Sequence, residues 1–102
     1  MDEMMRVLSR YPNGTYIKVD WDNALLKLGG LIETIYQTDN GLAEYLSEYR
    51  EYYAAVFRIK DILRNESANT YSPSMVMELS MLSAPSRIKL EDDTVIWENQ
   101  AS

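Results

Sequence analysis

The chain has 102 residues, of which 46% are hydrophobic and 25% charged, and its formal net charge at pH 7 is −6. This size and composition predict one small globular domain over residues 1–102, and no apolar run approaches the about 20 residues of a membrane helix. The absence of His and Cys excludes histidine-dependent catalytic triads, thiol nucleophiles and ordinary zinc sites. We therefore expect a protein that is not an enzyme and that needs no catalytic metal or cofactor.

The first segment is expected to form a β-hairpin over residues 5–19. Its turn is Pro12-Asn13-Gly14, a sequence typical of turns between β-prone runs. The run after the turn alternates apolar and polar side chains, as a half-buried strand does. A short helix over residues 2–10 is the alternative for the first half, because its apolar residues also have helical spacing. The two strands of the hairpin would cover residues 6–11 and 15–19.

The next element is expected to be a helix over residues 21–37. Asp20 is a good N-cap, and Asp22 places negative charge in the first turn. Gly29-Gly30 interrupts the pattern and predicts either a kink or a close approach of another backbone. The apolar side chains of this segment fall on one face of a helix: Trp21, Leu25, Leu28, Ile32 and Ile35.

A turn at residues 38–41 leads to a longer expected helix over residues 42–65. Apolar side chains recur every seven residues along it, and aromatic side chains flank them. Tyrosine is enriched in binding surfaces, and one small domain can hardly bury so many on a single helix. The cluster therefore predicts an oligomer or partner interface, with a core helix covered on two sides as the alternative. Its members are Tyr45, Tyr49, Tyr52 and Tyr53.

Two more elements complete the expected fold. Ser72-Pro73 is a typical helix start and predicts a short helix over residues 72–82. A second hairpin is expected over residues 87–98, with its turn at Glu91-Asp92-Asp93. The sum is an α+β fold, in which the N- and C-terminal hairpins form one small antiparallel sheet packed against about three helices. A mostly helical domain with a small terminal hairpin is the competing architecture.

The negative charge is concentrated between residues 20 and 49, where six acidic side chains face one lysine. Acidic character disfavours direct binding to nucleic acid or to an anionic membrane and favours a basic partner surface. The acids could also serve only to keep the domain soluble. If a partner is bound there, the side chains expected to meet it are Asp20, Asp22, Asp39, Glu44 and Glu48, with the four tyrosines as the other candidate interface.

Neither acidic cluster has the pattern of a metal site. The segment beginning at Asp20 lacks the Gly and Glu of a calcium loop, since Leu25 and Leu31 stand at those positions. Carboxylates at Glu91-Asp92-Asp93 are more simply explained as a hairpin turn than as ligands of a hard cation. The sequence therefore predicts no metal.

The function that these features favour is protein–protein interaction. Size and charge are those of small acidic inhibitors such as immunity proteins, antitoxins and phage-encoded anti-defence proteins, including anti-CRISPR proteins. Such a protein would occupy a basic surface of its partner, for instance that of a nucleic-acid-binding enzyme. The alternative is a structural or assembly subunit that forms a homodimer or larger homo-oligomer through the tyrosine-rich helix. Because the first residues lack the apolar run of a secretion signal, we expect a cytoplasmic protein.

Overall fold

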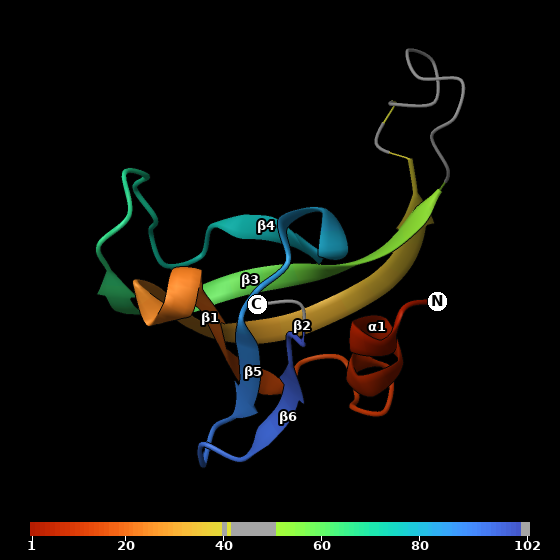
Figure 1. Cartoon of the computed structure of the whole chain (residues 1–102), viewed down its shortest axis with the longest axis horizontal. Helices are drawn as coiled ribbons and strands as arrows, with labels where there is room; N and C mark the ends of the chain where they lie inside the picture. The colour runs from red at the N-terminus through yellow and green to blue at the C-terminus, as the bar shows by residue number, and fades with distance from the viewer. Residues whose placement is uncertain (40, 42–50, 101–102) are drawn as a thin grey trace.

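The computed structural model describes residues 1–39, 41 and 51–100. Its main feature is one six-stranded antiparallel sheet with the strand order β4-β3-β2-β1-β5-β6 (Figure 1). No helix in the described part of the chain is long and apolar enough to cross a membrane. The elements are α1 (Glu3–Leu8), β1 (Tyr16–Trp21), η1 (Asp22–Ala24), β2 (Leu26–Thr38), β3 (Tyr52–Asn65), β4 (Val76–Ser80), η3 (Met81–Ser83), β5 (Arg87–Leu90) and β6 (Val95–Glu98), where η denotes a 3-10 turn.

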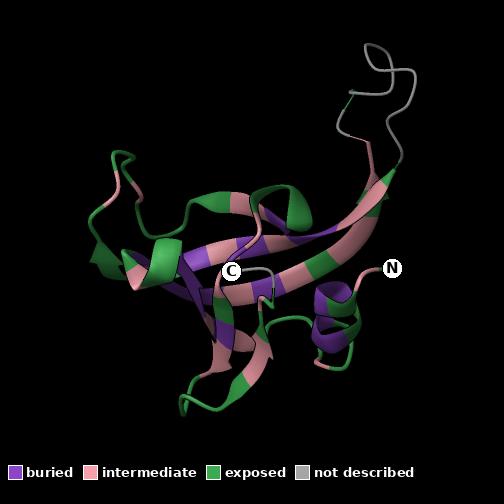
Figure 2. Ribbon diagram, in the orientation of Figure 1, coloured by how far each residue is buried: buried purple, intermediate pink, exposed green. Residues whose placement is uncertain are grey.

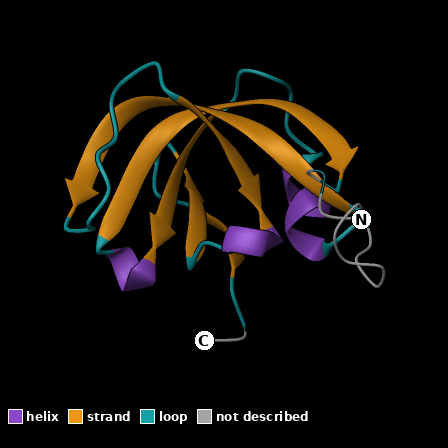
Figure 3. Ribbon diagram, turned by 90° about the horizontal axis from the view of Figure 1, so that it is seen from above, coloured by secondary structure: helices purple, strands orange, loops and turns teal. Residues whose placement is uncertain are grey.

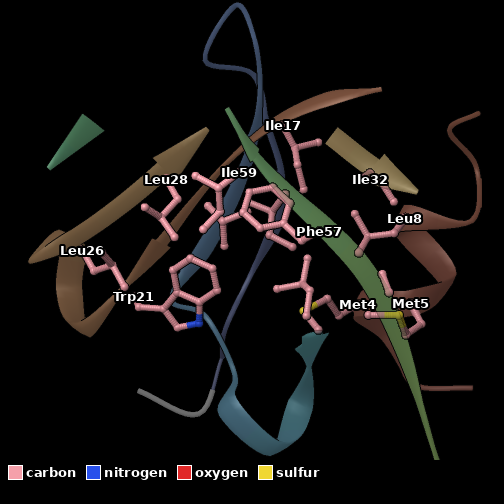
Figure 4. Packing of buried hydrophobic residues seen from close by; sticks show 14 residues of the cluster. Met4, Met5, Leu8, Ile17, Trp21, Leu26, Leu28, Ile32, Phe57 and Ile59 are labelled. Atoms are coloured by element: carbon pink, nitrogen blue, oxygen red, sulfur yellow. The ribbon is translucent and has the colours of Figure 1, made fainter. Parts of the chain in front are cut away.

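The sheet curves strongly and carries the core on its concave face. Figure 3 shows the strands arching over the short helical segments, and Figure 2 shows buried residues along the middle of the sheet and on α1. Successive side chains of a strand point to opposite faces, so β1 directs Ile17 and Val19 inward and Lys18 outward. The core of Figure 4 comprises Met4, Met5, Leu8, Ile17, Val19, Trp21, Leu26, Leu28, Ile32, Ala55, Phe57, Ile59, Leu79 and Ile88.

The N-terminal segment is a helix followed by a strand, not a hairpin. Asp2 caps α1, because its carboxylate accepts a hydrogen bond of 2.9 Å from the Met5 amide. The helix then buries Met4, Met5 and Leu8 beneath the sheet. The alternative prediction of a short helix over residues 2–10 is therefore confirmed, and the expected first strand of the hairpin is wrong. The expected turn and second strand are confirmed, since Thr15 N donates to Pro12 O and β1 follows.

The prediction of an α+β fold with about three helices is wrong. The expected helix over residues 21–37 is the end of β1, η1 and most of β2, so Asp20 lies in a strand and caps no helix. The described part of the expected helix over residues 42–65 is β3, and residues 72–82 contain β4 and η3. Only α1 is an α-helix among the described residues.

Register shifts between β2 and β3 explain the misleading helical spacing. Ile32 pairs with Phe57 and Ile35 pairs with Ala55, so β2 contains one residue more than β3 between these two pairs. A β-bulge of this kind places two inward side chains three residues apart, which is also the spacing of a helix face. A second shift lets both Ile59 and Ile62, which are three residues apart in β3, point toward the core.

The glycine pair lies at one of these irregularities and is needed for close approach. A Cβ on Gly30 would lie 2.2 Å from the carbonyl oxygen of Arg58, and one on Gly29 would lie 1.9 Å from the Tyr16 hydroxyl. The expected close approach of another backbone is therefore confirmed at Gly30, where it is between strands, whereas Gly29 approaches a side chain. The alternative prediction of a helix kink is wrong, because both glycines lie in β2.

The C-terminal hairpin is where the sequence predicts it. β5 pairs antiparallel with β6, and the turn between them is closed by Leu90 N, which donates to Thr94 O over 2.8 Å. β5 also pairs with β1, so strands near the two ends of the chain do join one sheet. Among the described residues no group of three or more carboxylates is arranged to hold a metal ion.

Candidate partner-binding surface

The outer, convex face of the sheet carries charged side chains that pair across strands. Arg87 Nη2 lies 2.9 Å from Glu98 Oε1, and Arg58 forms an ion pair with Glu33. The hydrogen bond from Arg58 holds the pKa of the Glu33 carboxyl below its usual value. These two pairs place charges of opposite sign next to each other on this face.

The acids predicted to meet a partner do not form one patch. Asp20 and Asp22 lie just before β2, and Asp39 follows its last residue, so the 13-residue strand separates them. Asp20 is buried, its side chain only 7% exposed and its carboxylate 3.9 Å from Lys89 Nζ. Asp22 is exposed in η1, and Asp39 accepts a hydrogen bond of 2.8 Å from Gly41 N. Glu44 and Glu48 lie outside the described residues.

The tyrosines predicted as an interface are likewise dispersed. Tyr52 and Tyr53 are neighbours in β3 and therefore point to opposite faces of the sheet. The Tyr52 hydroxyl donates to the Glu78 carboxylate over 3.0 Å, whereas Tyr53 packs against the core. The expected helix is thus absent at these two positions. Tyr45 and Tyr49 lie outside the described residues.

A different group of residues forms an acidic hollow that the sequence analysis missed. It is a shallow, open depression where the loop after α1 and the start of β1 meet the β5–β6 turn, and it has a volume of about 550 Å³. No cationic side chain lines it, and both of its carboxylates are exposed. We call it the Tyr11/Tyr16 hollow; its lining residues are Tyr11, Thr15, Tyr16, Leu90, Glu91 and Asp92.

The electrostatics of the hollow are negative. Burial, a hydrogen bond of 2.7 Å from the Tyr16 hydroxyl to Asp61, and the charges of Asp61 and Glu91 raise the pKa of Tyr16 to about 12. Hydrogen bonds from Thr94 lower the pKa of Asp92, and the Thr94 amide donates to its carboxylate over 3.0 Å. The hollow therefore holds the ionised carboxylate of Asp92 beside the neutral phenol of Tyr16 at neutral pH.

This arrangement predicts an unusually late ionisation of Tyr16. Because its folded pKa is about 12 against a usual 10, its contribution to stability is complete below pH 10 and disappears as the pH rises through 12. The phenolate absorbance of the wild-type chain minus that of Tyr16→Phe, read within milliseconds of a pH jump, should have its midpoint near pH 12. A midpoint near pH 10 would show that Tyr16 does not face these carboxylates.

Comparison with known protein families gives a match over nearly the whole chain. A family model described as cognate immunity protein YxxD matches residues 1–101, whereas no curated protein and no solved structure matches the chain. A cognate immunity protein is partnered with a toxin, so the expectation of an inhibitor that binds another protein is confirmed at that level. The match covers nearly the whole chain, and the chain therefore belongs to the YxxD family of cognate immunity proteins.

Proposed function

We propose that the chain neutralises its cognate toxin by occupying a basic surface of that toxin with acidic side chains. One observation carries the proposal. Within the described residues, the five ion pairs engage five cationic side chains, while the exposed carboxylates of Asp22, Glu91 and Asp92 stand outside these pairs. Because each pair uses one carboxylate and one cation, the charge that remains outside the pairs is still acidic overall, and these three carboxylates carry part of it.

The chemistry of the toxin surface follows from this excess. Opposite charge accelerates association and disfavours partners of the same sign. A basic surface is typical of proteins that bind nucleic acid. We therefore favour a toxin that acts on nucleic acid and whose substrate-binding surface the chain covers.

The homo-oligomer alternative is weakened at the two tyrosines that the structure describes. It needs a tyrosine-rich helix, but the structure places Tyr52 and Tyr53 in β3. A homodimer remains a prediction, and the mass of the free chain in solution at micromolar concentration tests it.

The proposal predicts toxin association that is fast and sensitive to salt. Raising the salt from about 20 to 200 mM should slow association several-fold, because exposed charges are screened over about 10 Å near 0.1 M. The double variant Asp22→Asn/Asp39→Asn should associate more slowly at low salt and depend less on salt. Asparagine suits these positions, since it tolerates the positive φ of 50° at Asp22 and keeps an acceptor for Gly41 N.

Stopped-flow or surface-based kinetics with the purified toxin measure both effects. The melting temperature of the double variant should hardly change, because Asp22 is exposed, Asp39 is only partly buried, and charges near the surface contribute little to stability. Association with the wild-type chain that is independent of salt would contradict the proposal, as would a chain that leaves the toxin active.

A further inference from the structure

We propose that the Tyr11/Tyr16 hollow receives a lysine or arginine side chain of the cognate toxin. This inference rests on the proposed function and specifies one contact within it. The occupant is a long side chain with an alkyl stem and a cationic end, presented by a protein surface.

The lining residues match both parts of such a side chain. The rings of Tyr11 and Tyr16, together with Leu90, offer apolar surface to an alkyl stem. The carboxylates of Glu91 and Asp92 offer acceptors for an ammonium or guanidinium group. A cation held over a tyrosine face gains further from the ring quadrupole.

The neighbouring charges leave the two carboxylates available. Lys18 Nζ lies 3.1 Å from Asp93 Oδ1, so its ion pair is with the third acid of the turn, while its charge acts on Asp92 only from farther away. Asp61 is occupied by the Tyr16 hydroxyl. The Thr94 amide fixes the carboxylate of Asp92 without neutralising it, which reduces the conformational entropy that a partner must remove.

A second hollow, lined in part by Asp20 of β1 and Glu98 of β6, does not need an external cation. It has a volume of about 310 Å³. Arg87 also lines it and already pairs with Glu98 over 2.9 Å, while Lys89 lies 3.9 Å from Asp20. The chain itself therefore supplies the positive charge at that place, in contrast to the Tyr11/Tyr16 hollow.

Model compounds test the hollow without the toxin. The acetylated methylamides of lysine, arginine and norleucine are titrated into the full chain at constant ionic strength and followed by NMR. The two cationic compounds should shift the amide signals of Thr15, Tyr16 and Leu90, and neutral norleucine should not. The shifts should disappear in Glu91→Gln/Asp92→Asn, in which asparagine still accepts from Thr94. They should persist in Glu51→Gln/Glu66→Gln, which removes the same charge elsewhere on the exposed surface.

Three outcomes of the titration would overturn the inference. These are no shift with either cation, equal shifts with norleucine, and unchanged shifts in Glu91→Gln/Asp92→Asn. The melting temperature of Glu91→Gln/Asp92→Asn shows whether this variant is folded. Its titration is compared with that of the control variant, Glu51→Gln/Glu66→Gln, under conditions in which both are folded.

The toxin complex gives the second test. Removing a charge that is enclosed in an interface mainly accelerates dissociation, so Glu91→Gln/Asp92→Asn should raise the dissociation rate about tenfold and the control variant should not. Equal dissociation rates for the wild type and this variant would overturn the inference and leave the proposed function standing. A chain that fails to neutralise the toxin would refute the proposed function, and the titration would still decide whether the hollow accepts a cation.

Discussion

Replacing Phe57 by alanine is expected to lower the free energy of unfolding by about 3–5 kcal/mol, the usual cost of truncating a buried phenylalanine. Phe57 is fully buried near the middle of the concave face, and its ring lies 6.5 Å from that of Trp21 (Figure 4). It also bears on both halves of the core, since it pairs with Ile32 of β2 and Met77 of β4. A small domain has only about 5–15 kcal/mol in total, so the variant should be close to unfolding. Urea denaturation followed by circular dichroism measures the loss.

Val76 provides a matched control for this truncation. It lies on the neighbouring strand β4 but is 48% exposed, so Val76→Ala should change the stability by no more than about 0.5 kcal/mol. A loss below about 1 kcal/mol for Phe57→Ala would show that the core is not organised around this ring.

The parts of the fold that could be predicted are those governed by local chemistry. The structure has three of the predicted features: the turn at Pro12-Asn13-Gly14, the strand after it and the C-terminal hairpin. In both regions the sequence shows turn residues beside β-prone runs. The cap at Asp2 is also local, but the apolar residues of α1 fitted two periodicities. Without the tertiary structure, nothing in that short segment decides between them.

The central strands could not be predicted because their pattern is ambiguous. In β3, the alternation of Phe57 and Ile59 with Arg58 and Lys60 is a strand signal. The bulges, however, shift the inward positions and create spacings of three as well as two. A bulge depends on the partner strand, which a single segment does not reveal. Over a longer segment, apolar residues with these mixed spacings favour a helix. The sequence therefore predicts helices over residues 21–37 and 42–65, where the structure has β2 and β3.

The candidate site is a product of tertiary structure in the same sense. Tyr11 and Glu91 are 80 positions apart in sequence and meet only because β1 pairs with β5. The acidic triplet that begins at Glu91 was correctly assigned to a turn, and a turn is also where it can present charge to a partner. The charge argument predicted an acidic contact, but it selected Asp20, which the fold buries.

Gly30→Ala adds a single methyl group, but it is expected to lower the free energy of unfolding by about 3 kcal/mol. The added Cβ would lie 2.2 Å from the Arg58 carbonyl oxygen and 3.0 Å from the Phe57 ring. The oxygen belongs to the backbone of β3, which pairs with β2 on one side and β4 on the other, so it cannot move without disturbing the sheet. Thermal and urea unfolding of the purified variant measure the loss.

Gly29→Ala makes the comparison that separates this mechanism from a general intolerance of strand glycines. Its Cβ would meet the Tyr16 hydroxyl at 1.9 Å, which is the far end of a side chain able to rotate away at the cost of its bond to Asp61. We expect a loss of about 1 kcal/mol, much of which should already be present in Tyr16→Ala. The double variant Gly29→Ala/Tyr16→Ala should therefore lose less unfolding free energy than the sum of the losses of the two single variants. Equal effects of Gly29→Ala and Gly30→Ala, or full additivity with Tyr16→Ala, would contradict the assignment of one glycine to a side-chain contact and the other to a backbone contact.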